Sequence, residues 1–295
     1  MKVIFHQRFY EVYTSDPAAA PGRMEPMVEE LEKEFDTFDG AKPRFLNRGK
    51  KRRSVSTLSI PRGLVLSAVE GSGRGVEWVE FVEPEPASEK DLERVHGRQH
   101  IQWVKGDPMV YEIGLLAAGG AILAGEIAFD GEPAFGLIRP PGHHASPHSC
   151  WGFCYFNNIA IAIKRLISEE KIKSAMILDF DLHYGDGTSN IFSSSKEVRY
   201  FHPEGTNRES FLKDLQRGLQ TEGSYEIIAV SAGFDRHKED WGGLLKTEDY
   251  LSIGGWVKEF ALQNCRGRRF GVLEGGYNHS VLGRNVESFL QGLRD

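Results

Sequence analysis

The segment most able to do chemistry is DFDLHYGDG, residues 179–187, which follows an apolar run. Alternate side chains of an extended backbone share one face, so Asp179, Asp181 and His183 point the same way. Asp181 and His183 can then bind one metal ion. The best candidate for a third ligand is Asp235 of SAGFD, after another apolar run. Three protein ligands and a position left for water form the pattern of catalytic zinc sites.

Two adjacent histidines, His143 and His144, stand in the segment RPPGHHA, on a turn stiffened by two prolines. A divalent ion whose charge is nearly cancelled by two carboxylates acidifies water weakly, so a separate general base is needed. We expect one imidazole to take a proton from the attacking water while the other, protonated, acts on the substrate. Asp179 can orient His143 and Asp186 can orient His144, which would separate the roles of the two rings.

Two further segments can complete such a site. Tyr277 in EGGYN keeps its phenol proton at neutral pH and can donate a hydrogen bond to an oxyanion. Gly275, two residues earlier, lets the backbone approach closely. Gly152 and Phe153 in GFCYFNN can wall a narrow channel for an alkyl chain, with ordinary core packing as the alternative. Metal, base, acid and oxyanion donor together indicate hydrolysis of a carbonyl compound.

These segments need a scaffold that brings them together. Apolar runs typical of strands occur near the N-terminus and at 134–138, 175–181, 226–232 and 268–274. Helical patterns occur at 24–38, in two pieces after Ser88, and at 109–129, 157–170 and 248–265. Strands that alternate with helices indicate a parallel sheet in a layered α/β fold, whose sites lie beyond the carboxyl ends of the strands. The motifs follow those ends, so we expect them to meet.

Composition narrows the class of protein. The chain has 295 residues, 40% of them hydrophobic, and a net charge of −6, so nucleic-acid binding by bulk charge is not expected. The three cysteines, Cys150, Cys154 and Cys265, are too few for a disulfide framework and fit a reducing compartment. The N-terminus lacks the pattern of a signal peptide, and we see no apolar run of about 20 residues. We therefore expect a cytoplasmic protein without a membrane span.

The segment 41–75 differs in kind from the rest of the chain. It is rich in Ser and Gly, has no acidic residue from Ala41 to Val69, and contains the run KKRR at 50–53. We interpret it as a solvated loop. The alternatives are a docking patch for an acidic partner and a contact in a homo-oligomer.

Taken in order, RPPGHHA, GFCYFNN, DFDLHYGDGT, SAGFD and LEGGYN resemble the motifs of the histone deacetylase superfamily, which includes the bacterial acetylpolyamine amidohydrolases. The resemblance covers residues 88–295 and, loosely, the N-terminal strand. It implies a single catalytic domain over 1–295, with an insertion or loop at about 41–75. It also implies the three-layer arginase/deacetylase fold, around a mostly parallel sheet of about eight strands.

The resemblance also implies roles for individual residues. Zn²⁺ is bound by Asp181, His183 and Asp235 in this picture, and K⁺ is often bound through the backbone around 179–183. The residues that it implies for catalysis are His143, His144, Tyr277, Asp179 and Asp186.

The chain also departs from the family pattern. Tyr184 stands where the family usually has a second histidine, next to the ligand position. The segment after RYFHPEG is short, which leaves the second aromatic wall of the family's substrate tunnel without a match. Trp241 and Gly242 stand near the position that selects substrates, and no glutamate of the kind that attracts a polyamine is found there.

The leading hypothesis is a zinc-dependent amidohydrolase that removes an acetyl or longer acyl group from an amine on a flexible alkyl arm, as in acetyl-lysine or an acetylpolyamine. His143 is assigned as base and His144 as acid, although coupled titration leaves that order open. Fe²⁺ is an alternative to Zn²⁺. One alternative function is a ureohydrolase of the same fold with two metal ions, and another is a module that binds acylated ligands without turnover.

Overall fold

The computed structural model describes residues 1–33, 78–220 and 223–295. The basic segment at 41–75 and residues 34–38 of the helix predicted at 24–38 lie outside the described residues. In the described part, the predicted helix is α1, Glu25–Leu31, which ends before residues 32 and 33.

The described residues contain one seven-stranded sheet in which every neighbouring pair is parallel, in the order β2-β1-β3-β7-β6-β4-β5. This confirms the prediction of a parallel α/β sheet, with seven strands in the described part where about eight were expected. The strands are β1 (Lys2–Ile4), β2 (Glu80–Val82), β3 (Ala134–Gly136), β4 (Ala175–Asp179), β5 (Val198–Phe201), β6 (Ile227–Ala232) and β7 (Arg269–Leu273).

The two edge strands are the ones that the sequence pattern did not indicate. The central strands β3, β4, β6 and β7 are buried along their whole length, so they read as continuous apolar runs. In contrast, β2 is partly exposed throughout and β5 is buried only at Val198. An edge strand has polar positions facing solvent and therefore lacks that run.

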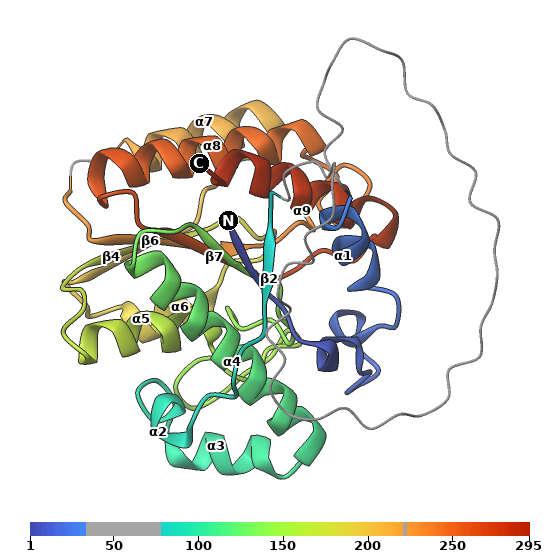
Figure 1. The fold of residues 1–295 in the computed structure, drawn as a ribbon, viewed down its shortest axis with the longest axis vertical. Helices are drawn as coiled ribbons and strands as arrows, with labels where there is room; N and C mark the ends of the chain where they lie inside the picture. The colour runs from blue at the N-terminus through green and yellow to red at the C-terminus, as the bar shows by residue number, and fades with distance from the viewer. Residues whose placement is uncertain (34–77, 221–222) are drawn as a thin grey trace, which may run out of the picture. The chain divides into compact units, whose positions relative to one another are not determined.

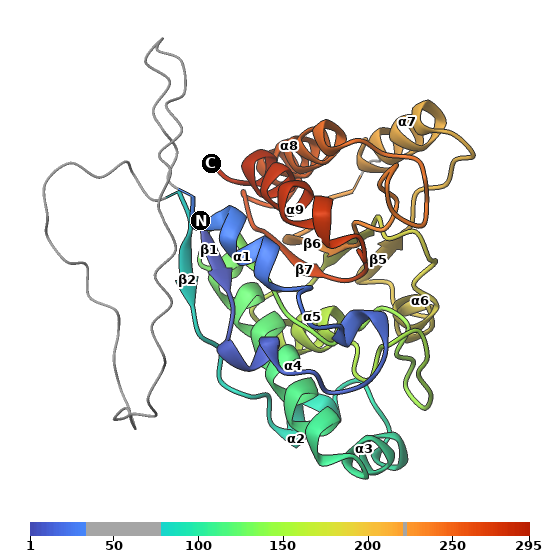
Figure 2. The same ribbon diagram turned by 90° about the vertical axis from the view of Figure 1, so that its right-hand side faces the viewer.

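Helices cover both faces of the sheet and complete the three layers (Figure 1). On one face lie α4 (Pro108–Phe129) and α5 (Asn158–Ser168), with the short helices α2 (Glu89–Leu92) and α3 (Arg98–Lys105) outside them. The other face is covered by α7 (Arg208–Leu219), α8 (Thr247–Asn264) and α9 (His279–Leu293), and α1 lies beside α9 in both views (Figures 1 and 2). Ser88 caps α2 as the sequence predicted, by accepting a hydrogen bond from the Asp91 backbone.

The long helix α4 departs from one expectation. By length and composition alone it could cross a membrane, whereas the sequence analysis saw no such segment. However, 67% of its most apolar window is buried inside the protein. A Cβ on Gly119 would lie 1.9 Å from the Glu85 carbonyl oxygen, so the helix packs closely on its neighbours. These contacts explain the apolar composition of α4 as that of a core helix.

Candidate active site

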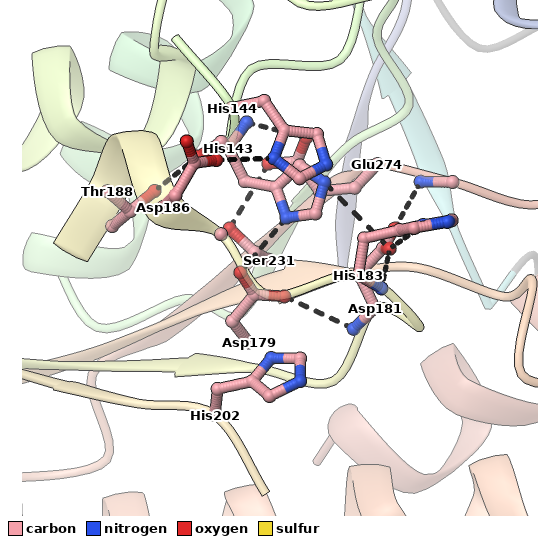
Figure 3. A network of polar contacts seen from close by, with 12 residues as sticks. His143, His144, Asp179, Asp181, His183, Asp186, Thr188, His202, Ser231 and Glu274 are labelled. Carbon is pink, nitrogen blue, oxygen red and sulfur yellow. Dashed lines mark hydrogen bonds and ion pairs between the residues drawn. The ribbon is translucent and has the colours of Figure 1, made fainter. Parts of the chain in front are cut away.

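The predicted motifs meet at one edge of the sheet. His143 and His144 follow β3, Asp179 ends β4, Asp235 follows β6, and Tyr277 follows β7. Because β3, β7, β6 and β4 are consecutive neighbours and all parallel, their carboxyl ends lie side by side. Figure 3 shows the histidines and carboxylates of β3 and β4 facing one another at this edge.

The three predicted metal ligands converge on one point. The Nδ1 atom of His183 lies 3.2 Å from Asp181 Oδ1 and 3.1 Å from Asp235 Oδ2. All three donor atoms lie within 4.8 Å of one another. Ligand atoms at about 2.0 Å from a tetrahedral zinc ion lie about 3.3 Å apart, so the distances around His183 fit a bound zinc ion.

The two carboxylates of this cluster are buried and held by backbone donors. The Gly275 N–H donates to Asp181 Oδ2 over 2.8 Å, and the Leu182 N–H donates to Asp235 Oδ1 over 2.9 Å. Asp235 Oδ2 has no hydrogen bond of good geometry within the described part of the chain, although His183 Nδ1 is close to it. Burial and the charge of Asp181 raise the pKa of Asp235 to about 6. A cation would satisfy that oxygen and offset the repulsion.

The tandem histidines lie above this cluster, each against a different carboxylate. His143 Nδ1 lies 3.1 Å from Asp179 Oδ2, and His144 Nδ1 lies 2.7 Å from Asp186 Oδ1. These are the two pairs that the sequence analysis proposed. The other ring nitrogen of His143, Nε2, lies 3.8 Å from Asp181 Oδ1 and therefore faces the candidate metal site.

The two imidazoles have shifted pKa values of opposite direction. Burial lowers the pKa of His143, but the charges of Asp181 and Asp179 outweigh it and hold the pKa well above its usual value. Burial and the positive charge of His143 lower the pKa of His144 to about 4. The pair thus divides into a charged and a neutral ring, as two catalytic roles require. A divalent cation beside Asp181 would cancel the charge that keeps His143 protonated.

Glu274, at the end of β7, is a residue that the sequence analysis missed. It is fully buried, and its Oε2 accepts hydrogen bonds from the backbone of Gly142 over 2.7 Å and of His143 over 3.2 Å. Its Oε1 accepts one from the Ser231 hydroxyl over 3.1 Å. Glu274 therefore fixes the histidine turn to the central strands. An acidic residue directly after a buried strand was the available signal.

Tyr277 lies between two aromatic rings at the site. Its ring stacks on Trp241, with centroids 4.0 Å apart, and meets Phe153 edge-on at 6.0 Å. Burial, and the nearby charge of Asp181, raise the pKa of the Tyr277 phenol well above its usual value. The hydroxyl therefore stays protonated and can donate a hydrogen bond.

A cavity of about 350 Å³ opens above these groups. Its wall contains the predicted residues Gly152, Phe153 and Gly275, together with aromatic residues that the sequence analysis had not placed in a channel. The lining residues are Pro141, His143, His144, Trp151, Gly152, Phe153, His183, Trp241, Gly275 and Tyr277. The short segment that directly follows RYFHPEG, residues 206–215, contributes no lining residue, and Trp151 and Trp241 supply the additional aromatic walls.

Gly152 and Phe153 have an unusual backbone. Both have positive φ, 59° at Gly152 and 66° at Phe153. A Cβ at Gly152 would lie 2.4 Å from His144 Cδ2, so only glycine allows this approach. A left-handed conformation costs a non-glycine residue about 1–2 kcal/mol. In this backbone conformation the ring of Phe153 lies in the cavity wall. Backbone strain of this kind is typical of functional sites.

Two more hydrogen bonds hold the carboxylates of Asp186 and Asp179, which orient the histidines, in place. The indole Nε1–H of Trp151 donates to Asp186 Oδ2 over 2.9 Å. The hydroxyl of Tyr200, on β5, donates to Asp179 Oδ2 over 2.9 Å. Tyr184, beside the candidate ligand His183, is exposed and donates to Ser189. The tyrosine at this departure from the family pattern therefore lies outside the metal cluster.

The sheet and the groups at its edge define a three-layer α/β protein of the deacetylase type. Comparison with known proteins agrees. The model of the histone deacetylase domain matches residues 59–211 and 202–293. The crystal structure of the HDA15 HD domain superposes with a TM-score of 0.74 over 99% of this chain and 90% of that one, at 20% identity, which shows the fold.

Curated relatives give the same result. A probable deacetylase of Methanothermobacter thermautotrophicus is 32% identical over 284 residues, covering 78% of this chain and 82% of the relative. A histone deacetylase-like amidohydrolase of Pseudomonas aeruginosa is 28% identical, covering 71% of this chain and 70% of the relative. The chain belongs to the histone deacetylase family, whose domain is a hydrolase that acts on amide bonds.

Proposed function

We propose that this chain is a zinc-dependent deacetylase that hydrolyses the amide of an acylated amine carried on a flexible alkyl arm. The observation that carries the proposal is the convergence of His183 Nδ1 with one oxygen each of Asp181 and Asp235, directly below His143. Membership in the family supports amide hydrolysis as the reaction. The cluster of Asp181, His183 and Asp235 supports a metal ion in this reaction.

The donor set fits a zinc ion. Asp181, His183 and Asp235 would hold the ion with their converging atoms, and the unpartnered Oδ2 of Asp235 would gain its missing partner. When bound, zinc would act as a Lewis acid that polarises the amide carbonyl and acidifies the attacking water. Glycine is required at position 275, because a Cβ there would lie 2.6 Å from Asp181 Oδ2.

The chain's own residues would move the protons. His143 accepts the proton of the attacking water at Nε2, while its Nδ1–H remains bonded to Asp179. The Tyr277 hydroxyl donates to the oxyanion that forms as water adds to the carbonyl. His144, oriented by Asp186, passes a proton to the leaving amine. It can carry that proton only when His143 is neutral, because burial and the charge of His143 otherwise lower the pKa of His144. This order requires a cation beside Asp181, because His143 is otherwise the ring that stays protonated.

The cavity favours an acyl-lysine arm over an acetylpolyamine. Its wall is built from aromatic rings, glycine, proline and the histidines, and contains no carboxylate. An uncharged alkyl arm suits such a wall, whereas a polyamine carries further cations that would gain no ion pair there. We therefore propose an acylated lysine side chain, in a peptide or a small molecule, as the substrate.

Turnover of matched substrates tests the proposal. Zinc-loaded protein is incubated with a fluorogenic acetyl-lysine peptide and, separately, with acetylated polyamines. We expect hydrolysis of the peptide with a higher kcat/KM, and loss of at least about 100-fold in His143→Ala. In Asp235→Asn we expect loss of both activity and bound zinc, as measured by elemental analysis. An absence of turnover across a panel of acyl amides, with measurable binding, would instead support the module that binds without catalysis.

The same elemental analysis separates the proposal from a ureohydrolase. Within the described residues the second cluster of potential ligands is His143, Cys154 and Glu274, which includes no aspartate and shares the histidine assigned as base. We expect one tightly bound ion per chain. Two ions would support the ureohydrolase. Comparing activity after loading with Zn²⁺ or Fe²⁺ identifies the metal.

Three further properties stay predictions: a single catalytic domain over residues 1–295, a cytoplasmic location, and a contact in a homo-oligomer as one role of the segment 41–75. Fractionation of cells and light scattering of the purified chain address the last two.

A further inference from the structure

Arg236 directly follows the candidate ligand Asp235 and points back under the metal site. It is only 7% exposed. Its Nε–H donates to the backbone oxygens of Phe180 over 3.2 Å and Asp181 over 3.0 Å, and its Nη2 donates to that of Leu182 over 3.3 Å. The guanidinium therefore joins three consecutive carbonyl groups of the segment that carries Asp181 and His183.

The surroundings of Arg236 are arranged for a permanent cation. Its Cζ lies 4.4 Å from the centroid of the Phe211 ring, on α7. Its Nη2 lies 3.0 Å from His202 Nε2, which must accept that hydrogen bond, so His202 is neutral. Burial and the charge of Arg236 contribute to lowering the pKa of His202, in agreement with this assignment. Figure 3 shows His202 close to Asp179.

The family resemblance implies K⁺ on the backbone of this same segment, and the residues present do not fit it. Proteins hold K⁺ with backbone carbonyl oxygens that replace its hydration shell. Here three carbonyl oxygens within 179–183 already accept hydrogen bonds from Arg236. A potassium ion beside them would also place a second positive charge against the guanidinium.

We propose that Arg236 is a positioning residue that takes the place of a structural potassium ion, so that the backbone carrying Asp181 and His183 is held by a cation built into the chain. Asp235, Asp181 and Asp179 attract the guanidinium, so the segment would then need no cation from solution. This inference concerns how the segment is held, and it goes beyond the proposed catalytic activity.

Thermal unfolding of the full, zinc-loaded chain in KCl, NaCl or choline chloride at equal ionic strength tests the proposal without reference to turnover. We expect the wild-type Tm to be the same in the three salts. In Arg236→Ala the three carbonyl groups lose their donor and space is left for an ion. We expect its Tm to fall in NaCl and to be about 2–4 °C higher in KCl than in NaCl, because K⁺ then binds only the folded state.

Arg269→Ala is the matched control. Arg269 is also buried and also donates to carbonyl oxygens, those of Leu293 and Gly267, but it begins β7 at the opposite end from the site. Relative to wild type, the Tm of Arg269→Ala should fall by the same amount in all three salts. Arg236→Lys keeps the charge, and its Tm should not respond specifically to K⁺.

Two results would overturn the inference. One is a wild-type Tm that rises by more than about 2 °C in KCl relative to NaCl, which would show that K⁺ binds although Arg236 is present. The other is an Arg236→Ala variant whose response to K⁺ is no larger than that of Arg269→Ala. If Arg236→Ala does not fold in NaCl, folding restored by KCl supports the proposal. If it folds in neither salt, Arg236→Lys decides: a Tm of this variant that is higher in KCl than in NaCl contradicts the proposal.

Discussion

The indole ring of Trp151 lies against the imidazole of His144, with ring centroids 3.8 Å apart. The same indole donates a hydrogen bond to Asp186, the carboxylate that orients His144. Trp151 therefore holds both members of the His144–Asp186 pair in place. Its own side chain remains 55% exposed, beside the cavity. It is thus a wall of the cavity and a support for one of the two histidines.

Replacing Trp151 separates these two contributions. Trp151→Phe keeps an aromatic face but loses the donor to Asp186, so kcat should fall by about fivefold with little change in KM, since one hydrogen bond contributes about 1 kcal/mol. Trp151→Ala also removes the wall and should raise KM. Trp103→Phe, at a 64% exposed position on α3, serves as control and should match wild type. Equal kcat for Trp151→Phe and wild type would refute the positioning role.

Asp240 should position Tyr277 through its backbone, without contacting the substrate. Its Oδ2 accepts hydrogen bonds from the backbone N–H groups of Tyr277 over 2.8 Å and Asn278 over 2.7 Å. Asp240→Ala frees both groups, so amide exchange at Tyr277 and Asn278 should accelerate and kcat should fall by about tenfold. In a Tyr277→Phe background the same change should have little further effect on kcat, because both act on one hydroxyl.

The exposed Asp130 at the end of α4 provides a control for that experiment. Asp130→Ala should leave both amide exchange at Tyr277 and kcat unchanged. Additive losses of kcat in the double variant of Asp240 and Tyr277 would show that Asp240 acts by another route.

Gly275→Ala should impair metal binding. The added Cβ would lie 2.6 Å from Asp181 Oδ2 and 2.9 Å from Asp235 Oδ2, so the backbone and both carboxylates must shift. The hydrogen bond from the Gly275 N–H to Asp181 would weaken with them. Loss of such support typically lowers metal affinity by about 10–100-fold, which competition with a chelator measures. Gly255→Ala, on α8 with open space around it, should keep full affinity.

Glu274 should make stability depend on pH. Burial raises its pKa from an ordinary 4.5 to about 7 in the folded protein. Between these values the folded state binds more protons than the unfolded state, so the free energy of unfolding falls as the pH rises through this range, by about 3 kcal/mol. Glu274→Gln cannot ionise, and its loss of stability over this pH range should be smaller by that amount. Calorimetry of both proteins from pH 4.5 to 8 measures the difference, and parallel curves would contradict it.

The sequence predicted the parts of this molecule in which local pattern and position agree. Continuous apolar runs identified β3, β4, β6 and β7, because those strands are buried on both faces. The motifs after them could then be assigned to one edge, since parallel strands share the direction of their carboxyl ends. The pairs His143–Asp179 and His144–Asp186 followed from counting histidines and spare carboxylates at that edge.

The contributions of other residues depend on contacts between distant segments and leave no local signal. Trp151 is next to the predicted Gly152, but its partner Asp186 lies on α6 (Asp186–Phe192). Asp240 acts on an N–H group 37 residues further along the chain. Arg236 resembles any surface arginine until Phe180 and its neighbours are seen to present their carbonyl groups to it.

The order of the strands has a consequence for synthesis of the protein. β7 follows the other six strands of the described residues in the sequence, yet it lies between β3 and β6 in the middle of the sheet. A nascent chain that ends before Arg269 therefore has the two halves of its sheet without the strand that joins them. Removal of residues 269–295 should therefore leave a protein that neither folds nor binds metal, and the catalytic edge can assemble only after β7 has left the ribosome.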